Sequence, residues 1–435
     1  LSLALDDFGH VPLIVRSSSL LEDRRGMAFA GKYKSLFIAN QGSKEERLKA
    51  LMDAIAEVYA SMFGPDPIEY RIEHGIRDYH EGMGILIQEV VGQRVGPYYF
   101  PAYAGVAFSN NEFPWSSRIK RKDGLVRMVP GLGTRAVDRL SDDYPILVAP
   151  GQSGLRVNVS LDEIRRYSPK KMDVINLETA SFETIDIQDL LDAYGKDYPI
   201  IQHIVSVLEQ DHVRIPRAFR IDFENDNLVI TFEGLFSNTN FLQRMNTILN
   251  QLQEKFSYPV DIEFAFDGQD FYLLQCRSQS YQEGSQPASL PQDIPAEQII
   301  FTANRYIANG IVENISHVVY VDSQHYQALS EIQDLLDVGR AIGRLNKILP
   351  KRQFILMGPG RWGSRGDRKL GVKVTYSDIC NTAMLIEIAR QRGEYMPEPS
   401  FGTHFFQDLV EASIRYLPLY PDNKNIKFKR AFFTQ

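Results

Sequence analysis

One stretch of the chain, a predicted helix followed at once by a predicted hairpin, restricts the fold more than any other. Over residues 241–256, apolar side chains recur at helical spacing along one stripe, which predicts an amphipathic helix. Two segments, 259–266 and 271–278, follow directly and are predicted to form two strands, since the Asp267-Gly268 pair between them is a hairpin signal. A helix that leads into a hairpin favours a mixed fold of helices and sheets.

The two predicted strands carry polar side chains at alternating positions. Successive side chains of a strand point to opposite faces, so Asp261 and Glu263 share a face, and so do Gln275 and Arg277. If the loop between the strands has an odd number of residues, all four lie on the same face. Carboxylate and amide oxygens suit Mg²⁺, and a guanidinium can bind a phosphate through two hydrogen bonds. Ordinary cross-strand salt bridges are the alternative, but for four residues at this spacing we favour a functional site.

The first hundred residues predict further strands and one clear helix. The run 11–15 is typical of a buried strand and ends in Arg16 and three serines. Helical spacing over 44–62 predicts an amphipathic helix, with Ser43 as N-cap and Glu46 three residues on as the second half of a capping box. A strand is predicted over 85–91, with the run 105–108 as its neighbour.

The composition changes near residue 280. Pro287, Pro291 and Pro295, separated by serines and glutamines, are typical of a semi-rigid linker. We therefore predict a first domain over 1–280, a linker over 281–298 and a second domain over 299–435. In the second domain, predicted strands (318–321 and 354–357) alternate with predicted helices (330–349 and 376–392), an α/β pattern.

Two motifs in the first domain resemble a known family. The hairpin sequence Asp261-Ile262-Glu263-Phe264-Ala265, with Leu274-Gln275-Cys276-Arg277, resembles the end of the nucleotide-binding domain of phosphoenolpyruvate synthase and pyruvate, phosphate dikinase. The start of that domain is similar to Val15-Arg16-Ser17-Ser18-Ser19, with Glu22-Asp23 and Phe29-Ala30-Gly31-Lys32 behind it. The resemblance covers residues 11 to about 280. It implies an α+β ATP-grasp fold, in which two lobes hold ATP, followed by a smaller α/β domain of the swivelling type.

The resemblance also implies roles for individual residues. Arg16 matches an arginine that contacts ATP phosphates, Glu263 and Gln275 match the Mg²⁺ ligands, and Arg277 matches an arginine that acts on the transferring phosphates, with Asp261 beside them. Gln88, Glu89 and Val91 match the strand that meets the adenine, largely through backbone groups. The sequence Gly131-Leu132-Gly133-Thr134-Arg135 looks like a glycine loop of this family, although a short Gly-x-Gly is more often a plain turn. The family also has a phosphate-binding lysine upstream, and none of the fifteen residues before Arg16 is a lysine. Either that segment precedes Leu1 in a longer chain, as we expect, or the nucleotide site is incomplete.

One histidine of the second domain is a candidate phosphoryl carrier. His404 follows Gly402-Thr403 and precedes Leu409, Val410, Ile414 and Leu417, whose spacing predicts a helix that begins near His404. The N-terminus of a helix favours an anion, and a histidine there could accept a phosphoryl group covalently. The turn distantly resembles the phosphohistidine turn of the family's swivelling domain. A capped structural histidine is the alternative.

A literal G-x-G-x-x-G also occurs in the second domain, at 358–363. A dinucleotide-binding site would require a helix directly after it, but the residues that follow are polar and contain glycine. We reject the dinucleotide interpretation. The loop could bind a phosphate or a carboxylate, or it could be a mobile basic loop, against which Trp362 argues because an indole usually packs.

Composition excludes several classes of protein. The 48 basic and 55 acidic residues give a net charge of −7, which argues against a nucleic-acid partner. No apolar run is long enough for a membrane span, and two cysteines among 435 residues favour a cytoplasmic location. The resemblance implies an ATP- and Mg²⁺-dependent phosphotransferase that passes phosphate through His404 to pyruvate or another small acceptor, or to a separate acceptor domain or protein. The alternatives are a nucleotide-sensing or partner-binding module without turnover, and a carbohydrate dikinase.

Overall fold

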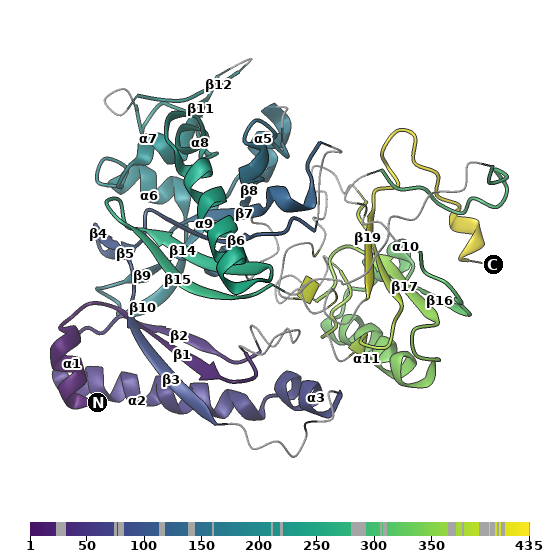
Figure 1. Cartoon of the computed structure of the whole chain (residues 1–435), viewed down its shortest axis with the longest axis horizontal. Coiled ribbons are helices and arrows are strands. Elements are labelled where there is room, and N and C mark those ends of the chain that lie inside the picture. Colours follow the sequence, from purple (N-terminus) through teal and green to yellow (C-terminus); the bar gives the residue numbers. More distant parts are fainter. Residues whose placement is uncertain are drawn as a thin grey trace. The chain divides into compact units, whose positions relative to one another are not determined.

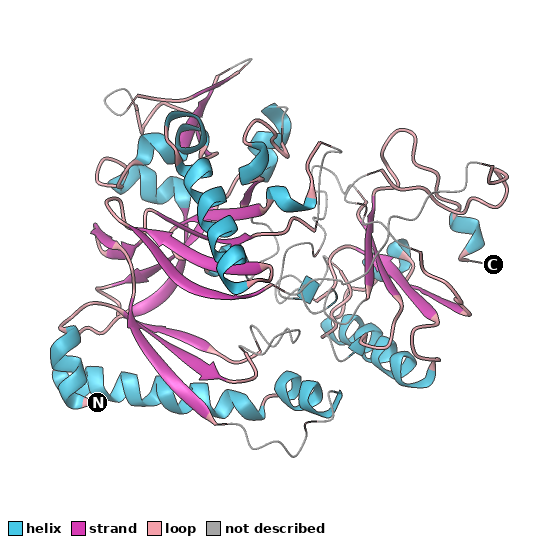
Figure 2. Ribbon diagram, in the orientation of Figure 1, coloured by secondary structure: helices cyan, strands magenta, loops and turns pink. Residues whose placement is uncertain are grey.

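The chain folds into two compact units that each combine helices with a sheet (Figure 2), and this confirms the mixed α+β class. The first unit comprises Leu1–Asn111, Arg118–Asp138 and Asp142–Gln279, and the second consists mainly of Ser280–Gln435. The computed structural model describes all residues except 23–31, 74–75, 77–81, 113–117, 138–143, 159–160, 210–211, 218–220, 280–292, 305–306, 308–310, 364–370, 376–377, 391–399, 401–404, 407–408, 410–413 and 435. Among the described helices, none is both long and apolar enough to cross a membrane.

The N-terminal lobe of the first unit is a three-stranded antiparallel sheet in the order β2-β1-β3, with helix α2 along one face (Figure 1). Its elements are α1 (Ser2–Phe8), β1 (Leu13–Ser19), β2 (Ser35–Ile38), α2 (Lys44–Ala60), α3 (Pro65–Glu73) and β3 (Met83–Glu89). Leu13 and Val15 of β1 pack against Leu51 and Val58 of α2 in one buried cluster. Because side chains alternate along a strand, Arg16 points to the opposite face of the sheet, away from α2.

The predicted capping box at the start of α2 is confirmed. The Glu46 N–H donates to the Ser43 hydroxyl over 3.3 Å, and the Ser43 N–H donates to a Glu46 carboxylate oxygen over 2.8 Å. We expect Ser43→Ala to lower the free energy of unfolding by about 1 kcal/mol, because a backbone donor of the first turn loses its acceptor. Urea unfolding followed by circular dichroism measures this loss. Ser43→Gly is the matched control and should cost only a few tenths of a kcal/mol; equal costs for the two variants would contradict the capping role.

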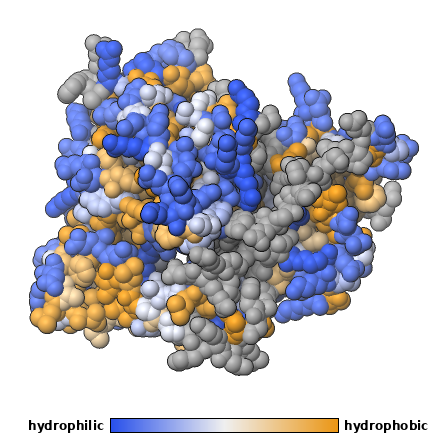
Figure 3. All heavy atoms as spheres, viewed as in Figure 1, coloured by the Kyte–Doolittle hydropathy of each residue, from blue (hydrophilic) through white to orange (hydrophobic). Residues whose placement is uncertain are grey.

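The C-terminal lobe is built on a five-stranded sheet in the order β15-β14-β6-β7-β8. The strands of this sheet are β6 (Tyr103–Phe108), β7 (Leu125–Pro130), β8 (Ile146–Val148), β14 (Val260–Phe266) and β15 (Phe271–Ser278). Helix α9 (Phe241–Phe256) buries Met245 and Leu249 in the same core cluster as Ile262 and Phe264 of β14. The predicted helix over 241–256 and the predicted hairpin are therefore confirmed. On the face seen in Figure 3, the surface of this lobe is mostly hydrophilic.

Two smaller sheets and several short helices complete the C-terminal lobe. One sheet has the order β10-β9-β5-β4, and the other has the order β12-β11-β13. The remaining elements are β4 (Gln93–Val95), β5 (Tyr98–Phe100), α4 (Thr134–Val137), α5 (Leu161–Tyr167), β9 (Lys171–Asn176), β10 (Ser181–Asp186), α6 (Ile187–Tyr194), α7 (Ile201–Ile204), β11 (Val205–Leu208), β12 (Val213–Arg214), β13 (Leu228–Ile230) and α8 (Glu233–Asn238).

One predicted pairing in the first unit is wrong. The run 105–108 belongs to β6, which pairs with β7 and β14, whereas β3 pairs with β1. Only the short strands β4 and β5 separate β3 from β6 in the sequence, but β3 and β6 belong to different sheets. A buried run such as β6 carries no signal for its partner, because both of its faces are apolar.

The second unit contains a four-stranded parallel sheet in the order β16-β17-β18-β19. Its elements are β16 (His317–Tyr320), α10 (Ser323–Ala328), α11 (Ile332–Ile348), β17 (Phe354–Pro359), β18 (Met384–Ile388), β19 (Arg415–Leu419) and the 3₁₀ turn η6 (Arg430–Phe432). The helix predicted over 376–392 is wrong, because its centre is β18, a buried inner strand whose continuous apolar run also fits a helix. For the same reason Leu417, predicted to lie on a helix after His404, lies on β19.

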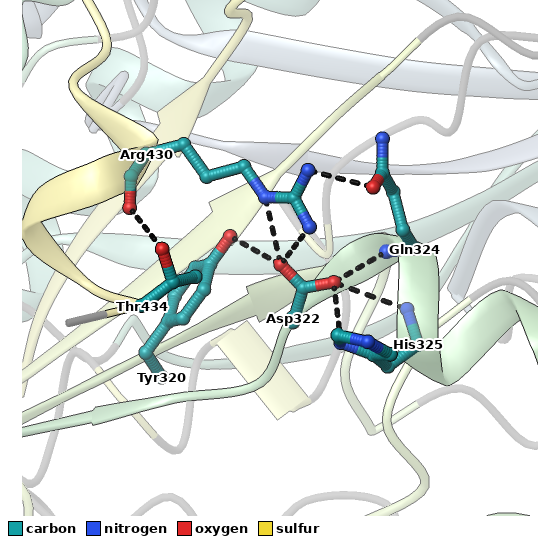
Figure 4. Close-up of polar contacts among 6 residues, drawn as sticks. All are labelled: Tyr320, Asp322, Gln324, His325, Arg430 and Thr434. Atoms are coloured by element: carbon teal, nitrogen blue, oxygen red, sulfur yellow. Dashed lines mark hydrogen bonds and ion pairs between the residues drawn. The ribbon is translucent and has the colours of Figure 1, made fainter.

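A carboxylate at the end of β16 holds the C-terminal segment of the second unit (Figure 4). Asp322 accepts hydrogen bonds from Nε of Arg430 at 3.0 Å, from the Tyr320 hydroxyl at 3.3 Å, and from the N–H groups of Gln324 and His325 at 3.0 Å. Burial opposes ionisation, but these donors outweigh it and hold the pKa of Asp322 below its ordinary value. The contacts fix η6 against the carboxyl end of an edge strand.

Candidate functional site

A β-bulge in the hairpin decides which side chains share a face. The loop between the paired residues Phe266 and Phe271 has four residues, an even number. With this loop alone, Arg277 would lie on the other face of the hairpin from Asp261. Between Glu263 and Phe264 the register shifts, so that Leu274 is an extra residue on β15. As a result Asp261 pairs with Arg277 and Glu263 pairs with Gln275, and all four side chains lie on one face.

Arg16 joins this face from the N-terminal lobe. Its Nη1 lies 3.0 Å from Oε2 of Glu263, and its Nη2 donates to Oε1 of Gln275 over 2.6 Å. The guanidinium therefore bridges two neighbouring strands of the other lobe. Arg16 is thus in direct contact with two other residues that the sequence predicted for the same site, although they lie about 250 positions further along the chain.

The second pair on this face is more deeply buried. Nε of Arg277 lies 2.8 Å and 3.0 Å from the two carboxylate oxygens of Asp261. Burial raises the pKa of Asp261 to about 6, although the adjacent guanidinium opposes the shift. Glu22, which accepts a hydrogen bond from the Ser17 hydroxyl over 2.9 Å, adds a further negative charge that favours the charged form of Arg277. Carboxylates thus orient both arginines of the site.

Sequence reasoning missed Arg127. This side chain of β7 is 1% exposed. Across the sheet, Val106 pairs with both Glu263 and Arg127, so Arg127 lies on the same face as Glu263 and Gln275, two strands away from Glu263. The signal in the sequence was a single arginine within an otherwise apolar strand, but its face could not be assigned without the register.

The residues expected to meet adenine lie at the end of the neighbouring strand. Gln88 and Glu89 are the last residues of β3, and Val91 lies just beyond it. Gln88 pairs with Ile14 and Leu86 pairs with Arg16, so Gln88 shares the face of the N-terminal sheet from which Arg16 projects. Among the described residues, no hydrogen bond or ion pair joins Gln88, Glu89 or Val91 to Glu263 or Gln275, both of which contact Arg16 instead.

The glycine loop at 131–135 is fixed by a buried aspartate. Nε of Arg135 donates to Asp173 over 2.9 Å, and the Thr134 hydroxyl donates to the same carboxylate over 2.6 Å. Gly131 has a φ of +72°, and a β-carbon there would lie 2.7 Å from the carbonyl oxygen of Asp173. Arg135 is thus engaged within the protein, which supports a structural role for its side chain.

In the second unit, the glycine loop after β17 is anchored by a buried carboxyl. Glu387 of β18 is 0% exposed and accepts hydrogen bonds from the Trp362 N–H (2.7 Å), the Ser400 N–H (2.6 Å) and the Tyr416 hydroxyl (2.6 Å). Trp362 is itself 0% exposed, so the interpretation of this segment as a mobile basic loop is wrong at Trp362. His404, the predicted phosphoryl acceptor, lies outside the described residues.

The Ser400 hydroxyl is a further donor to this buried carboxyl. The Ser400 hydroxyl oxygen lies 2.6 Å from the Trp362 carbonyl oxygen and 2.5 Å from Oε1 of Glu387. A hydroxyl has one hydrogen, so the Ser400 side chain shares its hydrogen between these two acceptor oxygens. Burial raises the pKa of Glu387 above its ordinary value, although the hydrogen bonds from Ser400, Tyr416 and Trp362 oppose the shift.

The donor set on the face of the hairpin fits Mg²⁺. This cation prefers oxygen ligands and is commonly bound by one or two protein groups together with substrate phosphates. Glu263 and Gln275 supply one carboxylate and one amide oxygen side by side, and Arg16 and Arg277 supply guanidinium groups suited to phosphate oxygens. Fold and site together define a two-lobed nucleotide-binding domain.

Comparison with protein families identifies which domain this is. The family model for the pyruvate phosphate dikinase AMP/ATP-binding domain matches residues 2–298. The chain therefore belongs to this family, and its first unit is an ATP-binding domain of a kinase-type, phosphotransferring family. A search of curated proteins gave no significant match to the chain.

Proposed function

We propose that this chain is an ATP-dependent phosphotransferase of the dikinase type. The observation that carries the proposal is the convergence of Arg16 from one lobe with Glu263 and Gln275 from the other, next to the Asp261–Arg277 pair. A site at which two lobes meet can position a nucleotide and exclude water from it. In this proposal ATP is the phosphoryl donor.

Each residue of the site has a distinct role in the proposal. Glu263 and Gln275 hold Mg²⁺, which when bound neutralises phosphate charge that develops during transfer. Arg16 and Arg277 bind phosphate oxygens, and Asp261 keeps Arg277 oriented through the contacts of its two carboxylate oxygens with Nε of Arg277. The strand that contains Gln88 and Glu89, with Val91 beyond it, contacts adenine through backbone groups.

A phosphoryl or pyrophosphoryl group then passes from ATP to His404 in the second domain, with ADP or AMP, respectively, as the leaving group. The linker at 281–298 allows that domain to move between sites. A neutral imidazole is a suitable nucleophile, and a phosphohistidine is reactive enough to pass the group on. Pyruvate is the acceptor implied by the resemblance; a separate acceptor domain or protein would serve in its place.

Labelling tests the transfer directly. After incubation of the protein with Mg²⁺ and ATP labelled at the β or γ phosphate, we expect acid-labile label on His404, found by peptide mapping. His404→Ala should abolish this label. His325→Ala, in which an exposed histidine of the same unit is removed, is the matched control and should retain it.

The labelling experiment also separates the two main alternatives. A nucleotide-sensing or partner-binding module would bind Mg·ATP and acquire no label, whereas a dikinase acquires it. Absence of label on a chain that binds Mg·ATP would refute the phosphohistidine step. Phosphorylation of a glucan in place of pyruvate would identify a carbohydrate dikinase.

A further inference from the structure

The Arg16 guanidinium contacts one carboxylate oxygen of Glu263 and the only side-chain oxygen of Gln275, the two residues of the proposed metal site. Its Nη1 contacts Oε2 of Glu263 at 3.0 Å and its Nη2 donates to Oε1 of Gln275 at 2.6 Å. Glu263 and Gln275 are direct cross-strand neighbours, so both contacts are made by one guanidinium across one pair of residues. The Arg16 and Glu263 side chains retain only 17% and 20% of their exposure, and solvent screening of this ion pair is correspondingly reduced.

Mg²⁺ and this guanidinium cannot use the same pair of oxygens together. Mg²⁺ binds its oxygen ligands at about 2.0–2.1 Å, which would place it within the space that the two Nη atoms now fill. The two cations would also repel each other across a few ångströms in a partly buried site. Binding of the metal to these two oxygens therefore requires Arg16 to move away from them.

A phosphate provides the position to which Arg16 can move. Guanidinium groups bind phosphate oxygens through two parallel hydrogen bonds, and a phosphate chain brings several negative charges. Backbone pairing of β1 with both β2 and β3 fixes the α-carbon of Arg16, while its long side chain can change rotamer. Arg16 can therefore exchange Glu263 and Gln275 for a phosphate without any change in the backbone of the sheet.

We propose that Arg16 competes with the divalent cation for Glu263 and Gln275, and that metal and nucleotide consequently bind as a coupled pair. This inference rests on the proposed function of the site. The metal alone must displace a guanidinium without compensation, whereas the metal with a nucleotide exchanges that guanidinium onto phosphate. Linkage then requires each ligand to strengthen the binding of the other by the same factor.

Binding of Mn²⁺, followed by electron paramagnetic resonance on the full chain without nucleotide, tests the competition. We expect Arg16→Gln to bind Mn²⁺ about tenfold more tightly than the unmodified protein, a value within the usual range of coupling. The same variant should bind Mn·ATP more weakly. Arg16→Lys keeps the positive charge and should gain little. Arg156→Gln removes an arginine that pairs with Glu233 and is the matched control for loss of one charge.

The outcomes distinguish this inference from the proposed function. If the unmodified protein binds Mn·ATP in a Glu263-dependent way but Arg16→Gln gains no affinity for Mn²⁺ alone, the competition is refuted and the metal site stands. If Glu263→Ala leaves Mn·ATP binding unchanged, the metal site itself is refuted, and the inference with it. Arg16→Met, with the fold checked by circular dichroism, is a second variant that lacks both the positive charge and any hydrogen-bond donor, and it should likewise bind Mn²⁺ alone more tightly.

Discussion

Glu263→Ala is expected to abolish binding of Mg·ATP, as measured by isothermal titration calorimetry. The substitution removes the only carboxylate of the proposed metal pair and leaves Gln275 as the single oxygen ligand beside Arg16. Loss of a partner one step removed from a metal typically costs 10–100-fold in affinity, and loss of a direct ligand should cost more. We therefore expect affinity to fall by more than about a hundredfold.

Two comparisons make this result specific. Glu57→Ala removes an exposed glutamate of α2 that pairs with Lys34, and it should leave the affinity unchanged. Glu263→Gln keeps the shape of the side chain and the hydrogen-bonding partner of Arg16 but removes the negative charge. Any loss of Mg·ATP affinity in this variant therefore measures the contribution of that charge to binding of the cation. Unchanged affinity in Glu263→Ala, with the fold intact by circular dichroism, would refute the assignment of the metal to this residue.

Glu387→Ala is expected to destabilise the second unit by about 4 kcal/mol or more. It leaves the N–H groups of Trp362 and Ser400 and the Tyr416 hydroxyl buried without their acceptor, and each such loss costs about 1–3 kcal/mol. Trp362 reports on this region directly, because it is fully buried and is one of two tryptophans in the chain. Urea unfolding of a Trp115→Phe background, followed by tryptophan fluorescence, therefore measures the second unit alone.

The matched control is Glu313→Ala, which removes an exposed glutamate of the same unit and should change the unfolding midpoint little. A small effect of Glu387→Ala would mean that the buried carboxyl does not hold the loop after β17.

The same carboxyl predicts the direction of a pH effect. Because burial raises the pKa of Glu387 above its ordinary value of 4.5, the folded unit holds this proton more tightly than the unfolded chain. Its contribution to stability is therefore greatest at low pH, falls as pH rises from 4.5 to the raised pKa, and is level above that. Glu387→Gln cannot titrate. The unfolding free energy of the unmodified protein minus that of Glu387→Gln should therefore fall as pH rises from 4.5 to the raised pKa. A rise of this quantity with pH would contradict the prediction.

Local sequence was sufficient to predict those elements whose structure depends on residues close together in the chain. The helix over 241–256 has the predicted bounds because its apolar stripe has a period that only a helix can bury. The capping box at Ser43 and Glu46 depends on residues three positions apart. In contrast, β18 was mistaken for a helix, since a strand buried on both faces lacks the alternation that identifies a strand.

The candidate site shows the same division. Its residue types and their alternation in the hairpin were readable, and so was their resemblance to a family that the match over residues 2–298 confirms. The bulge at Leu274, without which Arg277 would lie on the other face, has no sequence signal that we could use. The position of Arg127 on the same face depends on pairing across three strands.

The sequence alone therefore determined the chemical groups present. These are a hairpin with two carboxylates, an amide and an arginine, preceded by a helix, and a second arginine, Arg16, at the end of a strand near the start of the chain. Only the tertiary structure decided that Arg16 reaches Glu263 and Gln275, because this contact joins residues 247 and 259 positions apart on different sheets. Contacts at such separation arise from packing of whole elements, whose free energy is shared among many side chains and is encoded by no local pattern.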